Sequence, residues 1–181
     1  SWLDWQFTPY AVPLFVGAFA LVAVVIVSWV RRTVQGAVFL GWTSVCILFY
    51  ALGYIVEVGS QSVETTLIGL KIEYIGIPLM VPFLVMSMIT YLGYQRFLNP
   101  LTLSPLFLVP VMSSLLAWTN EYHEWLWVDL NIKTHDTYTA TLFERGVWNT
   151  WGVTVYSYVL LVILLVLMVR RFFRASGVYR R

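Results

Sequence analysis

Charged residues, cysteines and histidines are all scarce in this chain. Only 11% of its 181 residues are charged, whereas a soluble domain normally carries about 25%. Hydrophobic residues make up 60% of the chain and aromatic residues 17%, and aromatic side chains gather at both interfaces of a bilayer. The scarcity of charge therefore excludes an ordinary soluble domain and predicts an integral membrane protein.

The scarcity of cysteine and histidine excludes several kinds of site. Cys46 is the only cysteine, so the chain can form no internal disulfide. His123 and His135 have neither a cysteine partner nor a metal-binding spacing, and both fall outside the apolar runs, which argues against a metal site and against paired haem ligands. No phosphate-binding glycine loop, zinc-protease motif or nucleophile elbow is present. We expect no cofactor, no metal, no catalytic centre and no nucleic-acid binding.

Five apolar runs are long enough to cross a bilayer, for which about 20 helical residues suffice. They predict an all-α bundle of five transmembrane helices that forms a single domain over residues 1–181 in contact with the lipid bilayer. The link at residues 58–64 is short, so the second and third spans should be antiparallel neighbours. The expected spans are residues 9–30, 37–56, 65–94, 101–119 and 151–169, with a long loop at residues 120–149.

The long loop contains two stretches that suit extended structure. Residues 127–133 and 137–143 are rich in β-branched and aromatic residues, and His135-Asp136 between them can form a turn. We therefore expect a small extracellular β-hairpin between the fourth and fifth spans.

The charges divide between the two sides of the bundle. Eight arginines lie at alternate span ends, and all nine acidic residues lie on the other side with Lys71, Lys133 and Arg145. The excess of Lys and Arg in cytoplasmic segments predicts an amino terminus outside and a carboxy terminus in the cytoplasm of a cell membrane (plasma or inner). The eight arginines are Arg31, Arg32, Arg96, Arg170, Arg171, Arg174, Arg180 and Arg181.

The third span carries the most costly residues and is the expected core helix. Lys71 and Glu73 lie in its first turns, although an ionisable side chain costs roughly 2.5–3.5 kcal/mol near the centre of a membrane helix. Pro78 and Pro82 follow in mid-span, where each removes a backbone donor. With Pro105 and Pro110 of the fourth span, they are candidate conformational hinges.

Polar and aromatic side chains gather at the expected outer ends of spans two, three and four. Residues three apart share a helix face, so Tyr54 lies with Glu57, and Lys71 with Tyr74. An aromatic pocket with a few charges is typical of small-molecule sites. An ion pair between Glu57 and Lys71, and aromatic residues that only mark the interface, would also account for the pattern. The candidate ligand-binding residues are Tyr54, Glu57, Lys71, Glu73, Tyr74, Trp118, Asn120, His123 and Trp125.

Six stretches, taken in order, resemble a known family. They are residues 5–11, 51–57, 71–78, 118–123, 145–158 and 177–180. The chain is similar to the amino-terminal seven-helix membrane sensor region of archaeal and bacterial histidine kinases and of some diguanylate cyclases. The family pattern has two more helices and then signalling domains, so we expect a fragment of a longer protein or a natural short form.

The resemblance implies a membrane input domain of a two-component sensor. Such a domain would detect an unidentified stimulus or small molecule near the outer face, form a homodimer, and signal to a cytoplasmic domain. The chain itself would not be an enzyme, although its parent would be a histidine protein kinase. Two alternatives from other classes remain, a small transporter or channel subunit and an oligomerising membrane scaffold.

Overall fold

The computed structural model describes residues 4–135 and 138–176, with only the backbone for residues 174–176. Asp136 of the expected turn, and Arg180 and Arg181 of the expected cytoplasmic tail, lie outside the described residues. Five helices are long and apolar enough to cross a membrane, which confirms the predicted fold class. The helices are Ala11–Val30 (α1), Ala37–Val58 (α2), Val63–Tyr91 (α3), Pro100–Trp118 (α4) and Tyr156–Ser176 (α5).

Local sequence explains where α3 and α4 begin. The Ser62 hydroxyl accepts a hydrogen bond from the Thr65 backbone N–H at the start of α3. At the start of α4, Asn99 and Thr102 cap each other, and Pro100 occupies the first position, where a missing N–H costs nothing. Three shorter helical turns are Gln95–Phe97 (η1), Asn120–Tyr122 (η2) and the π-helical turn Asn149–Val155 (η3), which leads into α5.

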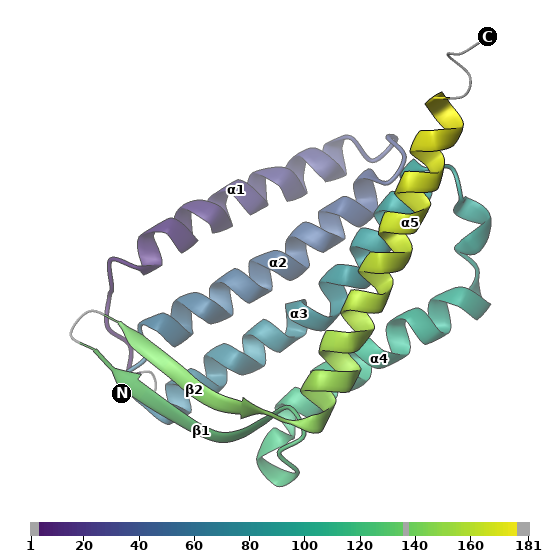
Figure 1. Cartoon of the computed structure of the whole chain (residues 1–181). Coiled ribbons are helices and arrows are strands. Elements are labelled where there is room, and N and C mark those ends of the chain that lie inside the picture. The colour runs from purple at the N-terminus through teal and green to yellow at the C-terminus, as the bar shows by residue number, and fades with distance from the viewer. Residues whose placement is uncertain (1–3, 136–137, 177–181) are drawn as a thin grey trace.

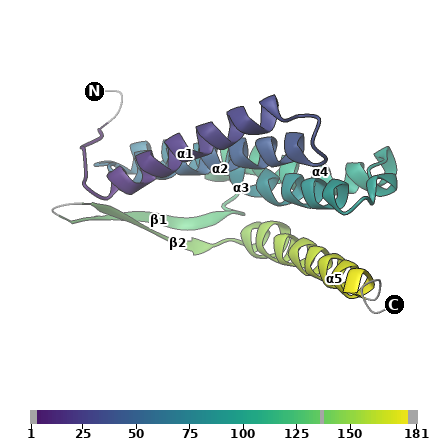
Figure 2. The same cartoon turned by 90° about the horizontal axis from the view of Figure 1, so that it is seen from above.

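Helices α1 to α4 form one layer in sequence order, and the hairpin and α5 lie on one face of that layer (Figures 1 and 2). We call the end of the bundle where α1 begins, α2 ends and α3 begins the hairpin end, because the two strands lie there. Helix α5 runs from this end to the opposite end (Figure 1). The segment before α1 is tied to the α2–α3 link, since Gln6 N donates to Gly59 O at 2.7 Å and Gln61 N to Asp4 O at 2.7 Å.

Helices α2 and α3 approach each other closely because small residues line their contact. A Cβ atom added at Gly53 would lie 2.5 Å from the Gly69 carbonyl oxygen, and one added at Gly76 would lie 2.0 Å from the Cys46 carbonyl oxygen. Small residues let membrane helices approach to backbone contact, where packing holds them together. This contact fixes which side chains of α3 face α2.

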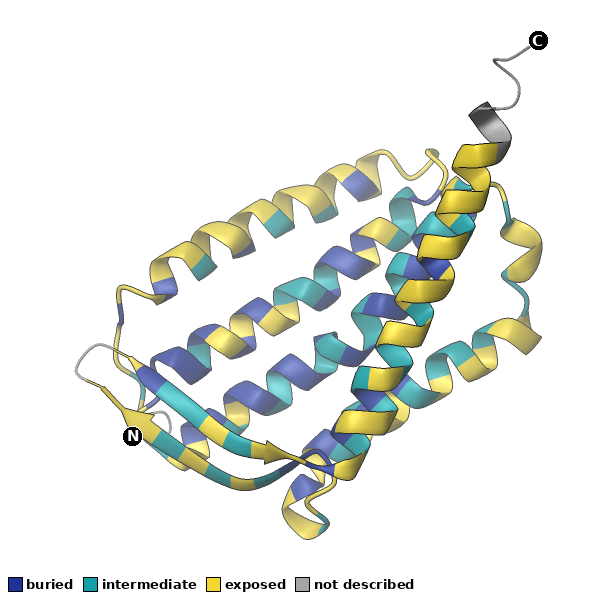
Figure 3. Ribbon diagram, viewed as in Figure 1, coloured by how far each residue is buried: buried dark blue, intermediate teal, exposed yellow. Residues whose placement is uncertain are grey.

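Helix α3 is the most buried helix, as the sequence predicted. Half of the residues in its most apolar stretch are buried, against a third or fewer in every other helix. Figure 3 shows the dark buried residues concentrated on α2 and α3, whereas α1 and α5 are mostly exposed. Exposed residues on these outer helices are largely apolar, such as Phe19 and Val162, which suits contact with lipid.

The predicted hairpin is present between α4 and α5. Strands Trp127–Thr134 (β1) and Thr139–Arg145 (β2) pair antiparallel, with Trp127 opposite Arg145 and Thr134 opposite Thr139. The register shifts between Val128 and Asn131. The Thr139 hydroxyl donates to the Ser60 carbonyl oxygen, which fixes the start of β2 against the α2–α3 link.

Candidate functional site

The nine predicted site residues all lie near the hairpin end, but they do not form one group. The three that belong to α3 point from different faces of that helix. Glu73 faces α2 and lies with Glu57 and Tyr54. Lys71 and Tyr74 instead face α4 and the hairpin, since they contact Glu121 and Trp127. The remaining predicted residues all lie at or just after the end of α4: Trp118, Asn120, His123 and Trp125.

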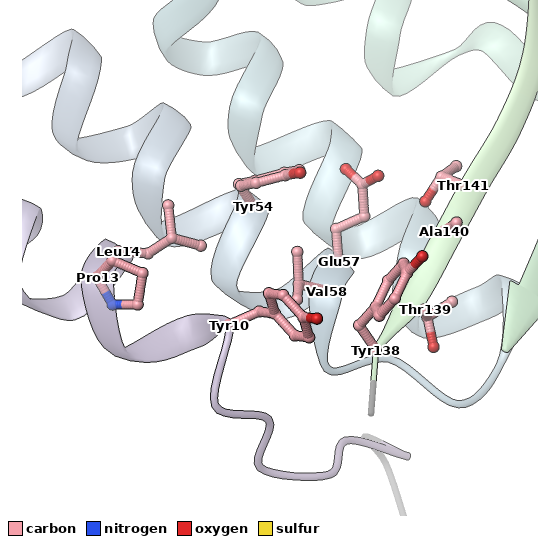
Figure 4. A pocket seen from close by; sticks show the side chains of 10 residues that line it. All are labelled: Tyr10, Pro13, Leu14, Tyr54, Glu57, Val58, Tyr138, Thr139, Ala140 and Thr141. Atoms are coloured by element: carbon pink, nitrogen blue, oxygen red, sulfur yellow. The ribbon is translucent and has the colours of Figure 1, made fainter. Parts of the chain in front are cut away.

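A cavity of about 460 Å³ lies at the hairpin end between α1, α2 and the start of β2. Tyr54 and Glu57 are the predicted site residues that line it (Figure 4). The Glu57 carboxyl group points into the space between Tyr54 and the start of β2 in this view. The other lining residues are Tyr10, Pro13, Leu14, Val58, Tyr138, Thr139, Ala140 and Thr141.

Glu57 and Glu73 form a buried carboxyl pair between α2 and α3. Glu57 is 8% exposed and Glu73 is 5% exposed, and the two carboxyl groups lie close enough to share a hydrogen bond when one of them is protonated. Glu73 reaches this place because α2 has no side chain at Gly53, where an added Cβ would lie 2.5 Å from Glu73 Cγ. Oε1 of Glu73 is buried and receives no hydrogen bond from an N–H or hydroxyl group among the described residues. Two acidic side chains therefore meet at the buried contact between α2 and α3.

The structure does not form the ion pair between Glu57 and Lys71 that was one alternative from the sequence. Lys71 Nζ lies 2.6 Å from Glu121 Oε1, just beyond the end of α4, so the ion pair joins α3 to η2. Lys71 does not reach Glu57 because positions 71 and 73 lie on different faces of α3, and Glu73 is the one that faces α2. The lysine is thus unavailable to neutralise the carboxyl pair.

Replacing Lys71 with methionine should change the stability of the bundle only slightly. The side chain of Glu121 is 48% exposed, and ion pairs of that exposure contribute at most about 1 kcal/mol. Thermal unfolding in detergent should give nearly the same midpoint for Lys71→Met as for Lys133→Met, whose lysine is exposed on β1. A loss of several kcal/mol in unfolding free energy for Lys71→Met alone would show instead that this ion pair is needed for the stability of the bundle.

Tyr74 belongs to a second cluster, which joins α3 to the loop and to η3. Asn149 Nδ2 donates to the Tyr74 hydroxyl at 2.8 Å, and the Tyr74 and Trp127 rings lie 5.3 Å apart. Asn120, which is 2% exposed, accepts from Leu126 N at 2.8 Å and donates to the Trp127 carbonyl oxygen at 2.8 Å. Asn120 therefore holds the start of β1 in place, and its amide group is engaged within the loop.

The other predicted residues lie at the periphery of this end. Trp118 is 54% exposed and Trp125 is 51% exposed, as expected of side chains that mark an interface. The His123 ring is occupied locally, since Nδ1 accepts from Trp125 N at 3.1 Å and Nε2 lies 3.1 Å from the Thr119 hydroxyl. These three side chains shape the loop and do not line the cavity.

Two of the predicted hinge prolines free carbonyl groups that neighbouring helices then bind. Pro78 has no N–H for the carbonyl four residues earlier, at Tyr74, and the Ser114 hydroxyl of α4 donates to that oxygen at 2.8 Å. Pro110 likewise frees the Leu106 carbonyl, which accepts from the Tyr156 hydroxyl of α5. Hydrogen bonds thus run from α3 to α4 and from α4 to α5 at the proline positions. No such side-chain donor from the described residues reaches the carbonyls freed by Pro82 and Pro105.

Sequence reasoning missed several residues of the site. Tyr10 and Tyr138 line the cavity from positions far apart in the chain, and no local pattern links them. Ser114 and Tyr156 had a detectable signal, because each places a hydroxyl group in an apolar span. Ser114 lies in a helix that contains prolines, and Tyr156 lies in the span that follows that helix. Glu121 was placed only as an outer charge.

These features define a multi-pass membrane protein of helical-bundle type, with a polar cavity at one end and hydrogen bonds that link its central helices. The family model of the N-terminal 7TM region of histidine kinase matches residues 13–181. The chain therefore belongs to this family of membrane sensor regions. No curated protein and no solved structure matches it.

Proposed function

We propose that the chain detects a stimulus in the cavity at the hairpin end and transmits it along α5 to a cytoplasmic signalling domain. The observation that carries this proposal is the position of the cavity. It contains a buried carboxyl group and lies at the end of the bundle opposite the end of α5 (Figures 1 and 4). Membership of a histidine kinase sensor family supports a sensory role, and the sensor region itself is not catalytic.

The orientation follows from the arginines. Arg31, Arg96 and Arg170 lie at the end of the bundle opposite the hairpin, and the positive-inside rule assigns that end to the cytoplasm. The hairpin end then faces outward from the cell membrane, and α5 leads into the cytoplasm. The parent protein is a histidine protein kinase in this proposal, and its input region is a homodimer.

The proline-freed carbonyls supply a route for the signal. A change at Glu73 moves α3, where Pro78 allows the helix to bend. Ser114 ties the bent segment to α4, and Tyr156 ties the Pro110 segment of α4 to the start of α5. A stimulus can shift such an arrangement only by its difference in affinity for two states, so these hydrogen bonds must differ between the states.

Replacing Tyr156 with phenylalanine should change signalling more than it changes folding. The experiment fuses the chain, at the end of α5, to the cytoplasmic part of a histidine kinase and measures autophosphorylation in membranes. Substitutions along a coupling route change the coupling by about 0.5–2 kcal/mol, which corresponds to a change of about twofold to thirtyfold in activity. Tyr156→Phe and Ser114→Ala should both fall in this range.

The matched control is Tyr158→Phe, because Tyr158 lies two residues further along α5 and is 65% exposed. This control should leave autophosphorylation at the wild-type level. Equal activity in all four fusions, with equal amounts of protein in the membrane, would overturn the proposed route.

A further inference from the structure

The walls of the cavity combine aromatic rings with a carboxyl group. Tyr10, Tyr54 and Tyr138 each contribute a ring, and the Tyr10 and Tyr138 rings meet edge to face with their centroids 5.1 Å apart. The face of an aromatic ring carries negative potential and attracts a cation, and several rings together recognise ammonium groups in proteins. The cavity is therefore suited to a positively charged group.

The carboxyl pair beside these rings has no basic partner among the described residues. An ionised carboxylate only accepts hydrogen bonds, so at least one of Glu57 and Glu73 must carry a proton when the two bond to each other, and the pair carries one negative charge whenever the other is ionised. Neither residue forms an ion pair with a described lysine, arginine or histidine, and Lys71 is held by Glu121. A buried charge without a partner is costly. One monovalent cation in the cavity would neutralise the pair.

The size and the remaining polar group of the cavity narrow the ligand further. A volume of about 460 Å³ falls within the range of small-molecule pockets, roughly 300–1,000 Å³. Pro13 and Leu14 provide apolar wall, and the Thr141 hydroxyl is buried with no hydrogen-bond partner among the described residues. An organic cation with one hydroxyl or similar polar group would satisfy all three kinds of wall.

We propose that this cavity binds an organic ammonium ion, with its charge between the tyrosine rings and Glu57. The proposal rests on the sensory function proposed above and names the class of its ligand. A soluble amine and the ammonium headgroup of a lipid share this chemistry.

The test compares choline with 3,3-dimethyl-1-butanol, which has the same shape and hydroxyl group but no charge. The protein is placed in nanodiscs of phosphatidylglycerol, a lipid without an ammonium group, and its thermal unfolding is followed. At a hundredfold excess over Kd, choline should raise the apparent Tm by about 5 °C or more, and the neutral alcohol should not. Equal shifts with both compounds, or no shift with either, would overturn the proposal.

Two variants and one control test where choline binds. Glu57→Gln keeps the shape of the side chain but removes its charge, so the shift with choline should be lost. Glu64→Gln removes an exposed carboxylate at the same end of the bundle and should leave it unchanged. Tyr54→Leu removes one ring, and choline should bind about fivefold to tenfold more weakly. A choline shift that persists in Glu57→Gln would contradict the assigned site.

The same nanodiscs distinguish the two sources of the ammonium group. If a lipid headgroup is the ligand, replacing phosphatidylglycerol with phosphatidylcholine should raise the Tm of the wild type, but not that of Glu57→Gln, without added choline. If a soluble amine is the ligand, the Tm should rise only when choline is added.

Failure of the ligand proposal and failure of the proposed function give different results. If choline does not bind, but Tyr156→Phe changes the activity of the kinase fusion, only the proposed ligand class is overturned. If choline binds, but the variants of the cavity and of the proline-linked hydrogen bonds all leave the activity of the kinase fusion unchanged, only the sensory function is overturned.

Discussion

Replacing Gly76 with alanine should destabilise the bundle by about 2–3 kcal/mol, because overpacking of a close contact forces the backbones apart. The added Cβ would lie 2.0 Å from the Cys46 carbonyl oxygen and 3.2 Å from Phe49 Cβ. Only a shift of α2 away from α3 can relieve a contact with backbone, and that shift would also disturb the Glu57–Glu73 pair. Thermal unfolding in detergent, compared with the wild type, measures the loss.

Gly17→Ala is the matched control for this prediction. Gly17 lies within α1 as Gly76 lies within α3, but a Cβ added there meets nothing within 4 Å. Alanine is a better helix former than glycine by about 1 kcal/mol, so this variant should be as stable as the wild type or slightly more stable. Equal unfolding temperatures for the two variants would contradict the close contact between α2 and α3.

Replacing Asn120 with alanine should lower the free energy of unfolding by about 3 kcal/mol, since each buried group left without its hydrogen bond costs roughly 1–3 kcal/mol of stability. The substitution leaves Leu126 N and the Trp127 carbonyl oxygen without the amide group that they bind. Both residues belong to the buried cluster that also contains Tyr74. The start of β1 should therefore loosen, and the hairpin should separate from α3.

Asn131→Ala provides the control within the same hairpin. Its amide donates only to the Asp129 carbonyl oxygen at an exposed position, so its loss should change the unfolding midpoint little. Tryptophan fluorescence, which averages over the nine tryptophans of the chain, should change in Asn120→Ala alone, because Trp127 should become more exposed. Equal stability and equal fluorescence in both variants would show that Asn120 does not hold the loop.

The five spans and the hairpin could be predicted because each follows from a local requirement. A bilayer demands long apolar helices, so the runs of the sequence mark α1 to α5 directly. The hairpin followed from alternating β-branched and aromatic residues around a turn. The central position of α3 followed from Lys71 and Glu73, because charged residues within a span are costly to expose to lipid and must be covered by neighbouring helices.

The partners of those charged residues could not be predicted. Helical spacing showed that Lys71 and Glu73 lie on different faces of α3, but not which neighbour each face meets. The sequence therefore left open an ion pair between Glu57 and Lys71, whereas Lys71 binds Glu121 in the structure. What decides the outcome is Gly53, whose missing side chain leaves room for Glu73 beside α2. Because glycine is frequent in membrane helices generally, its presence in a span does not reveal which side chain it accommodates.

The cavity could be predicted only in part. Tyr54 and Glu57 came from their shared face of one helix, whereas Tyr10 and Tyr138 reach the same space from segments far apart in the chain. Asn120, His123 and Trp125 were grouped with the cavity because they share its end of the bundle. The structure engages Asn120 and His123 in local hydrogen bonds, and Trp125 lies with them outside the cavity lining.

The most direct test of the sensory function is autophosphorylation of the kinase fusion with Glu57→Gln, measured in membranes beside Glu64→Gln. Both variants remove one negative charge at the hairpin end, but only Glu57 lines the cavity and bonds Glu73. We expect Glu57→Gln to change the activity about fivefold or more, while Glu64→Gln matches the wild type. Wild-type activity in a folded Glu57→Gln fusion would contradict the claim that this cavity controls the output.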